Sequence, residues 1–462
     1  MSSVEQSAHL DRLIDNILNT KFEDIPSDNI EHAKDRLLDT IGCMVCGAND
    51  IGNPELLSIV RDWGGKPEAR IFVHGDKVPA PTAAMVNCIM ARSFDFEPVS
   101  PVIDGQQLPG HISGTTTMTA LTLGDMQGVS GRELLASLLV GDDMATRVLL
   151  AGKGGTRRGY DHVGQANSFG ATAIAGRLMR LSHEQLKHAF GLILNHLGGA
   201  QRMISDTATG FKLSQGNSAR DAIYCVRLAQ AGWTGAEDAL LSEGGYYSMF
   251  TDGIKDPDLL TKDLGKNYYS DGTFKPYPCC RMNHAVVNCA VDIVADNHIS
   301  ADDIEKVIIY MHPGAMRDVI GQPFRIKNSP HASAGFSAQY TVASTLLRGS
   351  SRPEHFTEEA IRDTKLSDFL KKVSMAELKE GNMESGRVRV VMKDGREFDK
   401  FIEIAKGDPR NPLSREELLA KFWMNIDFSR TITRKNAEKV VKLVEDLENL
   451  DSVKKLVDLL IA

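Results

Sequence analysis

Two closely spaced acidic residues, Asp95 and Glu97, and a histidine, His111, lie within one stretch of the chain, residues 91–117. Asp95 and Glu97 follow the apolar helical run 85–90, and His111 comes after a loop rich in proline and glycine. An imidazole transfers protons near neutral pH, and a nearby carboxylate orients it and stabilises its charged form. Taken alone, this stretch fits either a proton-transfer site or a loop whose acids face water.

Three further stretches combine charged or imidazole-bearing residues with glycine or proline. They are residues 159–162, 207–216 and 275–284, with Asp161, His162, Lys212, Lys275, Arg281 and His284 as the members of interest. A lone histidine or lysine is more often a helix cap or a solvated charge than part of a site. These residues make a site only if the fold brings several of them to one cleft.

Together the four stretches resemble the MmgE/PrpD family, which includes 2-methylcitrate dehydratase, cis-aconitate decarboxylase and iminodisuccinate epimerase. The most specific motifs are Thr-Gly-Phe-Lys at 209–212, Ala-Gly-Trp-Thr-Gly at 231–235, the stretch 275–280 with His284, and Phe-Ser-Ala-Gln-Tyr at 336–340. The resemblance covers nearly the whole chain. It implies a helical domain built from both chain ends, a smaller α+β domain inserted late, an active cleft between them, a homodimer, and no required metal or organic cofactor.

The resemblance also assigns site residues. Its catalytic positions fall on Asp95, His111, His162, Lys212 and His284. The histidine motif is offset by one residue, because Asp161 directly follows the glycine-tyrosine pair, so Asp161 is the alternative to His162. Further cations could bind substrate carboxylates, although solvation is the commoner fate of such side chains. These candidates are Arg92, Arg202, Lys275 and Arg281.

The acidic motif departs from the family pattern. Many members read Asp-x-Asp-Asp-Thr, whereas residues 95–99 are Asp-Phe-Glu-Pro-Val. The loop before His111 is several residues longer than usual, and isoleucine replaces the proline that commonly follows the histidine. A hydroxyl and a carboxylate of better-known members are therefore absent, which weakens direct transfer of their substrates.

Members of this family share the chemical problem of forming or quenching a carbanion next to a carboxylate. A second negative charge then develops on the carboxylate oxygens, so fixed positive groups aimed at them lower the barrier. Lys212 is the candidate for that role. His111 and His162 suit proton transfer, Asp95 would orient one imidazole, and His284 would close the site from the second domain.

Three functions follow as hypotheses. The first is a cofactor-independent lyase that eliminates water or carbon dioxide from a small di- or tricarboxylate by proton transfer next to a carboxylate. The second is an epimerase or isomerase of a related carboxylate, similar to iminodisuccinate epimerase. The third is a non-catalytic dimer that binds a carboxylate.

The elements that must position these residues are mostly helices, because apolar residues recur at helical spacing through residues 1–260. Helices are predicted as a hairpin near residues 8–47, and at Pro79–Ser93, Gly114–Met126, Gly131–Leu150, Ser168–Met179, Ser182–Gly198, Asn217–Ala231, Ala236–Leu241, Met282–Asp296 and Ser333–Leu347. A strand is predicted at Ile304–Met311, and a hairpin turns at residues 393–395. The fold class is mainly α with an α+β second domain. Residues 1–265 and 405–462 form the helical domain, and residues 266–404 form the α+β domain.

Composition limits the partners and the compartment. The 462 residues carry a formal net charge of −8 without a block of like charges, which argues against nucleic acid as a partner. No signal-peptide core and no apolar run of membrane-spanning length is present, so no membrane partner is expected. Seven sparse cysteines indicate reduced thiols and a cytoplasmic protein. Cys43 and Cys46 lie inside a helical pattern, which favours core packing over a metal or redox site.

Overall fold

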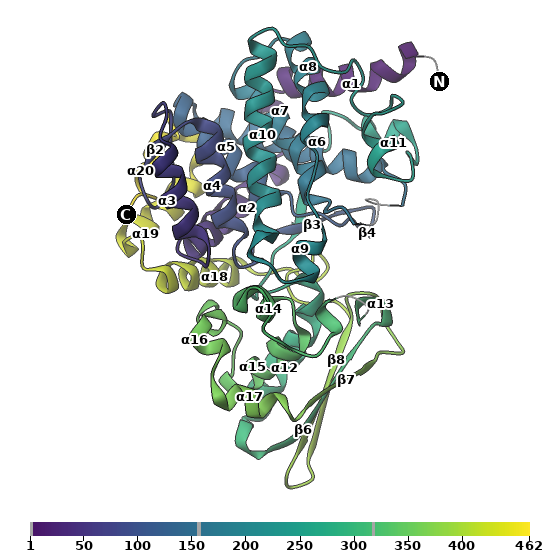
Figure 1. The fold of residues 1–462 in the computed structure, drawn as a ribbon, viewed down its shortest axis with the longest axis vertical. Helices are drawn as coiled ribbons and strands as arrows, with labels where there is room; N and C mark the ends of the chain where they lie inside the picture. The colour runs from purple at the N-terminus through teal and green to yellow at the C-terminus, as the bar shows by residue number, and fades with distance from the viewer. Residues whose placement is uncertain (1–2, 155–158, 317–318) are drawn as a thin grey trace.

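The computed structural model describes residues 3–154, 159–316 and 319–462. Helices of the N-terminal half and of the C-terminal end form a large upper part in Figure 1. The segment from His284 to Ile402 forms a smaller lower part, in which helices pack beside a sheet. The predicted fold class, mainly α with a smaller α+β part, is confirmed.

Helices of the large part come from both ends of the chain. They are α1 (Ser3–Asn19), α2 (Ser27–Gly47), α3 (Asn53–Trp63), α4 (Ala80–Arg92), α5 (Ser113–Gln127), α6 (Gly131–Ala151), α7 (Val163–Leu178), α8 (His183–Ile193), α9 (Arg202–Ser205), α10 (Leu213–Gln230), α11 (Tyr246–Phe250), α18 (Arg415–Ser429), α19 (Arg434–Glu445) and α20 (Lys454–Asp458). Serine hydroxyls cap several of them, as Ser182 does in a capping box at the start of α8. β1 (Ala69–Arg70) and β2 (Lys77–Val78) form a short hairpin.

The smaller part is built around a four-stranded sheet with the order β7-β6-β8-β9. Its strands are β6 (Ile304–Met311), β7 (Val373–Glu377), β8 (Gly386–Met392) and β9 (Glu397–Ile402). β6 pairs parallel with β7 and antiparallel with β8, and alternate residues of β8 are buried. The helices of this part are α12 (His284–Asn297), α13 (Pro313–Met316), α14 (Pro330–Gly335), α15 (Ala338–Arg348), α16 (Glu358–Ile361) and α17 (Thr364–Leu370).

Two large hydrophobic cores dominate the part of the chain that the structure describes. The first combines the N-terminal helices with buried residues between positions 422 and 460. The second surrounds β6, β8, α12 and α15, and it also takes in Cys43 and Cys46 from α2 and Phe94 and Phe96 from the loop after α4. Both cysteines are buried free thiols, so their predicted core packing is confirmed. The loop after α4 therefore belongs to both parts of the fold.

A three-stranded sheet with the order β4-β3-β5 lies ahead of His111. β3 (Val99–Ile103) pairs antiparallel with β5 (Asp271–Thr273) and with β4 (Gln106–Gln107), which fixes the long loop ahead of His111. We propose the domain division 1–265 with 405–462 against 266–404, and the distribution of residues between the two cores supports it.

The predicted helix Ala236–Leu241 is wrong. Its residues form turns, because the Asp238 carboxylate accepts hydrogen bonds from the Leu240 and Leu241 amides at 2.9 and 3.0 Å. An aspartate that binds nearby amides in this way competes with helix formation.

The predicted helix Ser333–Leu347 is two helices, α14 and α15. Ser337 has extended backbone angles between them, and its hydroxyl accepts a hydrogen bond from the Tyr340 amide as the cap of α15. Helix α7 also begins at Val163, five residues before its predicted start, and α3 was not predicted. The signal for α3 is Pro54 in its first turn, which follows Gly52 in the left-handed conformation.

Candidate active site

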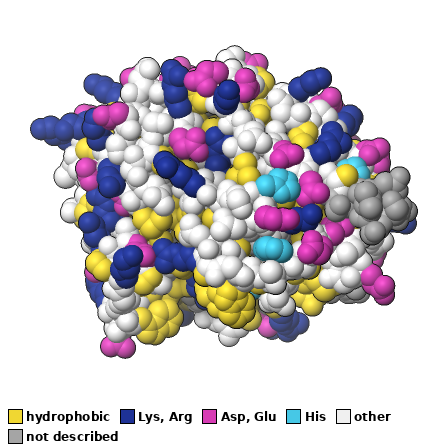
Figure 2. All heavy atoms as spheres, turned by 90° about the horizontal axis from the view of Figure 1, so that it is seen from above, with side chains coloured by type: hydrophobic (Ala, Val, Ile, Leu, Met, Phe, Trp, Pro, Cys, Tyr) yellow, Lys and Arg dark blue, Asp and Glu magenta, His cyan; other side chains and the backbone are white. Residues whose placement is uncertain are grey.

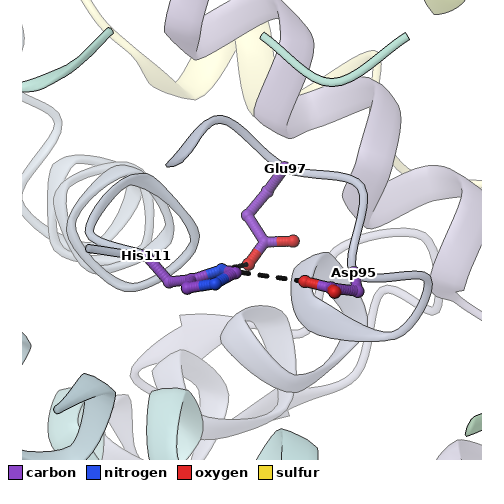
Figure 3. A group of neighbouring side chains, drawn as sticks. All are labelled: Asp95, Glu97 and His111. Carbon is purple, nitrogen blue, oxygen red and sulfur yellow. Dashed lines mark hydrogen bonds and ion pairs between the residues drawn. The ribbon is translucent and has the colours of Figure 1, made fainter. Parts of the chain in front are cut away.

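The loop that follows α4 carries a buried cluster of charged side chains. Phe94 and Phe96 pack into the second core, while Asp95 and Glu97 lie against His111 (Figure 3). Both acids are buried, and the backbone of Asp95 has φ +48°, a left-handed conformation that is uncommon outside glycine. The sharp turn places two carboxylates two residues apart on the same imidazole.

One guanidinium nitrogen of Arg92 connects the members of this cluster. Its Nη1 atom donates to Asp95 Oδ1 and, at 3.0 Å, to Glu97 Oε1. The same nitrogen lies 3.0 Å from Nδ1 of His111. Arg92 is the last residue of α4, so a rigid helix fixes the guanidinium to which the loop residues are attached.

Lys275 supplies a second buried cation from the chain segment that leads into the second domain. Its Nζ atom donates to the backbone oxygen and to Oδ1 of Asp95, both at 2.7 Å. Two cations therefore neutralise two carboxylates in a region shielded from water. Although burial opposes ionisation, the charges of Arg92 and Lys275 hold the pKa of Asp95 below its usual value, and Arg92 lowers the pKa of Glu97 strongly.

His111 is a neutral imidazole in this environment. Burial and the charge of Arg92 lower its pKa to about 4. Its Nδ1 atom lies 3.2 Å from Glu97 Oε1 and 3.7 Å from Asp95 Oδ1, so Glu97 is the closer carboxylate. Arg92 can only donate and Glu97 can only accept while ionised. Protonation of Nδ1 would therefore exchange the Arg92 contact for a hydrogen bond to Glu97.

His162 is the second imidazole of the site. Its ring centroid lies 6.0 Å from that of His111, and its side chain is 28% exposed against 18% for His111. Burial lowers the pKa of His162 as well. Asp161, the alternative candidate, uses its carboxylate to accept the Val163 amide at the start of α7. This geometry favours His162 over Asp161 as the proton-transfer residue.

Three polar residues that sequence reasoning missed hold His111 in place. Asn167 donates to the backbone oxygen of His111 at 2.7 Å, and Gln215 donates to Glu97 Oε1 at 2.9 Å. Asp271 on β5 accepts the backbone amides of residues 112 and 113 at 2.8 and 2.7 Å, and thereby caps α5 from another element. The contacts span 56 to 159 residues of sequence, so no local pattern indicates them.

Lys212 is engaged in a second buried cluster. Its Nζ atom donates to Asp50 Oδ2 at 2.8 Å, to the Ile51 oxygen at 2.7 Å and to Asn53 Oδ1 at 3.0 Å. His331 from α14 contacts the other oxygen of Asp50 at 2.6 Å. All three ammonium hydrogens thus have acceptors within the protein. In the part of the chain that the structure describes, no hydrogen bond or ion pair joins Lys212 to His111.

The Lys212 cluster nevertheless lies next to the Asp95 cluster. The guanidinium carbon of Arg92 is 5.4 Å from the centroid of the Phe211 ring, so the residue before Lys212 packs on the cation of the first cluster. On the other side, the ring of Phe94 is 4.3 Å from that of His331. Phe211, next to Lys212 in sequence, therefore contacts the Asp95 cluster, and Phe94, next to Asp95, contacts the Lys212 cluster.

The remaining candidates make no hydrogen bond to His111 among the described residues. His284 is fully buried at the start of α12, and its Nε2 atom lies 3.2 Å from the Cys279 oxygen. Burial and the charges of Arg281 and Lys275 lower its pKa far below the usual value, so it is neutral. Arg281 pairs with Glu384 and Asp408. Arg202 is 78% exposed and pairs with Asp206, and the structure does not bring it to the cluster.

One possible ligand atom from each of Asp95, Glu97 and His111 lies within 4.8 Å of the other two, a spacing that a metal ion could use. The same oxygens already accept hydrogen bonds from Arg92 and Lys275. A divalent cation would have to displace these cations or withstand their repulsion. The donor set therefore fits a charge-neutralised proton-transfer site rather than a metal centre.

A helical domain that carries these clusters, completed by residues of a smaller α+β domain, places the chain in a known class. The chain belongs to the MmgE/PrpD family: residues 11–257 match the N-terminal domain of that family and residues 277–448 match its C-terminal domain. The predicted family membership is confirmed.

Its relatives include cis-aconitate decarboxylases. The Homo sapiens enzyme is 26% identical over 460 residues, covering 93% of this chain and 90% of the relative. The Mus musculus enzyme is 25% identical over 455 residues, with 93% and 89% coverage. The Aspergillus terreus enzyme is 23% identical over 472 residues, with 96% and 94% coverage.

Proposed function

We propose that the chain is a cofactor-independent lyase that removes carbon dioxide, or water, from a small di- or tricarboxylate. The relatives that match along almost the whole chain are decarboxylases of a tricarboxylate, cis-aconitate, which supports decarboxylation over dehydration. The proposed catalytic residues are Asp95, His111, His162, Lys212 and His284, with Arg92 and Lys275 as the cations that support them.

The observation that carries this proposal is the placement of the His111 imidazole between two carboxylates and a guanidinium in a largely dry site. It has a second imidazole, His162, at a centroid distance of 6.0 Å. Two imidazoles this close can act on neighbouring atoms of one small substrate. Positioned groups of this kind typically contribute about 10² to 10⁴-fold in rate through proton transfer.

Decarboxylation breaks the carbon–carbon bond to the departing carboxylate, and the bonding electrons stay on the substrate until a proton joins them. A bound polycarboxylate brings negative charge beside His111, which raises the pKa of the imidazole and lets it take up that proton. Glu97 stabilises the imidazolium by accepting from Nδ1. His111 then delivers a proton to the substrate, either directly or through His162.

Lys212 would act on the negative charge of the substrate. Because its three donors are occupied, it reaches a substrate carboxylate by exchanging one present acceptor for a substrate oxygen. Asp50 keeps a partner during this exchange, since His331 holds its second oxygen. His284 would close the site as a neutral side chain.

An NMR screen in D₂O tests this function. Purified protein is mixed with cis-aconitate and with other hydroxy and unsaturated polycarboxylates. We expect one of them to lose carbon dioxide or water, with deuterium entering the product of a decarboxylation. Deuterium exchange without either loss would replace the lyase by an epimerase. Binding without turnover of any acid would leave a non-catalytic carboxylate-binding protein.

We also propose a cytoplasmic homodimer. Seven free cysteines, of which six are buried, support a reducing compartment. Basic and acidic side chains are interspersed over the face seen in Figure 2, which supports the absence of a nucleic-acid partner. No described helix is both long and apolar enough to cross a membrane. Light scattering on the purified protein measures the oligomeric state, and a monomer mass would refute the dimer.

A further inference from the structure

A buried lysine of helix α18 reaches the loop that carries the two site carboxylates. Lys421 Nζ donates to the backbone oxygen of Phe96 at 2.7 Å and to Asp39 Oδ2 at 2.8 Å. The same atom lies 4.1 Å from the centroid of the Phe96 ring. Lys421 and Asp39 are both buried, and they are 382 residues apart in sequence.

The contact is made at the peptide group between the two functional acids. Lys275 holds the backbone oxygen of Asp95, and Lys421 holds that of Phe96, the next residue. Two lysines far apart in sequence thus fix consecutive carbonyls, while the side chains of Asp95 and Glu97 face His111. A loop with a left-handed residue at position 95 needs such external contacts to keep its shape.

A buried ion pair is an expensive way to connect two helices. Its desolvation offsets most of its attraction, and an apolar pair of similar size is often equally stable. Asp39 is ionised with difficulty, because burial raises its pKa to about 6 in spite of Lys421. A contribution to stability alone therefore does not account for a buried charge at Lys421. Its hydrogen bond to the Phe96 carbonyl indicates a second role, which is to hold the 94–97 loop.

We propose that Lys421, held by Asp39, is a positioning residue that sets the placement of Glu97 and Asp95 against His111. The inference rests on the proposed function for its effect on turnover, but not for its effect on the geometry of His111. It makes α18 part of the framework of the active site. Loss of the contact would let the loop shift, and a misplacement of about 1 Å can cost about 10²-fold in rate.

The chain offers a matched control on the same two helices. Arg415 of α18 pairs with Asp35 of α2 at 2.6 Å, but both side chains are more than one-third exposed and neither contacts the 94–97 loop. Arg415→Met removes this salt bridge, and also the one from Arg415 to Glu445 of α19, without touching the site. If Lys421 had only a structural role, folded Lys421→Met and Arg415→Met would have the same turnover.

The test compares Lys421→Met, Lys421→Arg and Arg415→Met. In Lys421→Met we expect kcat to fall about 10- to 100-fold with little change in KM. Lys421→Arg should recover part of that loss, because it keeps a charged donor, and Arg415→Met should match the wild type. The imidazole ¹⁵N shifts of His111, which report its tautomer and hydrogen bonds, should change only in the Lys421 variants.

A second variant and a second measurement cover the cases in which Lys421→Met does not fold or the protein turns over no acid. If Lys421→Met fails to fold, the double variant Asp39→Asn with Lys421→Met removes both charges and leaves none unpaired. Wild-type kcat and wild-type His111 shifts in a folded Lys421 variant would overturn the proposal. If the wild-type protein turns over no acid, the proposed function fails, and the His111 shifts still decide whether Lys421 positions the loop.

Discussion

Two buried clusters of this molecule use the same kinds of residue and differ in how fully their atoms are paired. Around Asp95, His111 keeps 18% of its side chain exposed, and Glu97 Oε2 and Arg92 Nε have no hydrogen-bond partner among the described residues. Around Asp50, every donor of Lys212 and both carboxylate oxygens are paired.

The difference teaches which cluster can change its partners. An imidazole that lies between a donor and an acceptor can gain or lose a proton by switching contacts, as His111 can between Arg92 and Glu97. A saturated cluster joins elements, and here it connects the α2–α3 turn and residue 212 to α14 of the smaller part. Lys212 can take a new partner only by giving up one of its three present acceptors. Residue type alone does not separate these two roles.

His111→Ala breaks the first cluster and should have the largest effect. We expect kcat to fall by at least about 10²-fold, because the proton-transfer group is lost, while the melting temperature stays near that of the wild type. His183→Ala, at an exposed histidine of α8 that also faces acids, is the control. Near-normal turnover of the His111 variant would remove it from the mechanism.

Lys212→Met should damage both activity and folding. Turnover is expected to fall about 10²-fold, and the free energy of unfolding by about 3 kcal/mol, because Asp50 loses a buried partner. Thermal unfolding and steady-state kinetics measure the two effects. The double variant Asp50→Asn with Lys212→Met should regain stability without regaining activity. An inactive Lys212→Met of unchanged stability would show that the lysine serves only the substrate.

The Asp50 cluster should also control acid stability. Although burial opposes it, His331 and Lys212 lower the pKa of Asp50 to about 2. A lowered folded-state pKa stabilises the protein above the unfolded value near 4, and this stability is lost as pH falls toward 2. The loss amounts to something on the order of 2 kcal/mol. Unfolding curves between pH 2 and 6 should show this component in the wild type, and an identical profile in Asp50→Asn would refute it.

Asp271→Asn should have the smallest effect and the opposite pH dependence. Burial raises the pKa of Asp271 to about 7, so its stabilising contribution is complete below about pH 4 and declines as pH rises through 7. Asparagine keeps an oxygen for the amides at the start of α5 and cannot ionise. We expect turnover within about threefold of the wild type and a flatter stability profile from pH 4 to 8. A steeper profile in the variant would contradict this assignment.

Local patterns predict the helices and strands of this fold well where one face is apolar. Alternation gives β6 its observed bounds, and the Lys-Asp-Gly turn places the hairpin of β8 and β9. Predictions fail where a hydrogen bond from one side chain, rather than the apolar pattern, determines the backbone conformation. Asp238 does this by accepting hydrogen bonds from the amides of Leu240 and Leu241. The broken helix at Ser337 has the same cause.

The site was predictable as far as motifs reach. Asp95, His111 and His162 come together, and Arg92 and Lys275 join them. The roles of Asp50 and Lys421 were not predictable, because each depends on a partner far away in sequence. Lys212 and Asp50 are 162 residues apart, and only the fold shows that the lysine has no free donor.

The sharing of side chains between the two cores limits how this molecule can be divided or recombined. Phe94 and Phe96 belong to the segment 11–257 that matches the N-terminal family domain, but they pack in the hydrophobic core of the smaller part. Residues 450–460 lie beyond the segment 277–448 that matches the C-terminal family domain, and they pack in the core of the large part. A fragment with residues 277–448 alone would expose the hollow that these rings occupy. Exchange of whole domains between relatives would therefore succeed only if the 94–97 loop and the C-terminal helices travel with the partners they pack against.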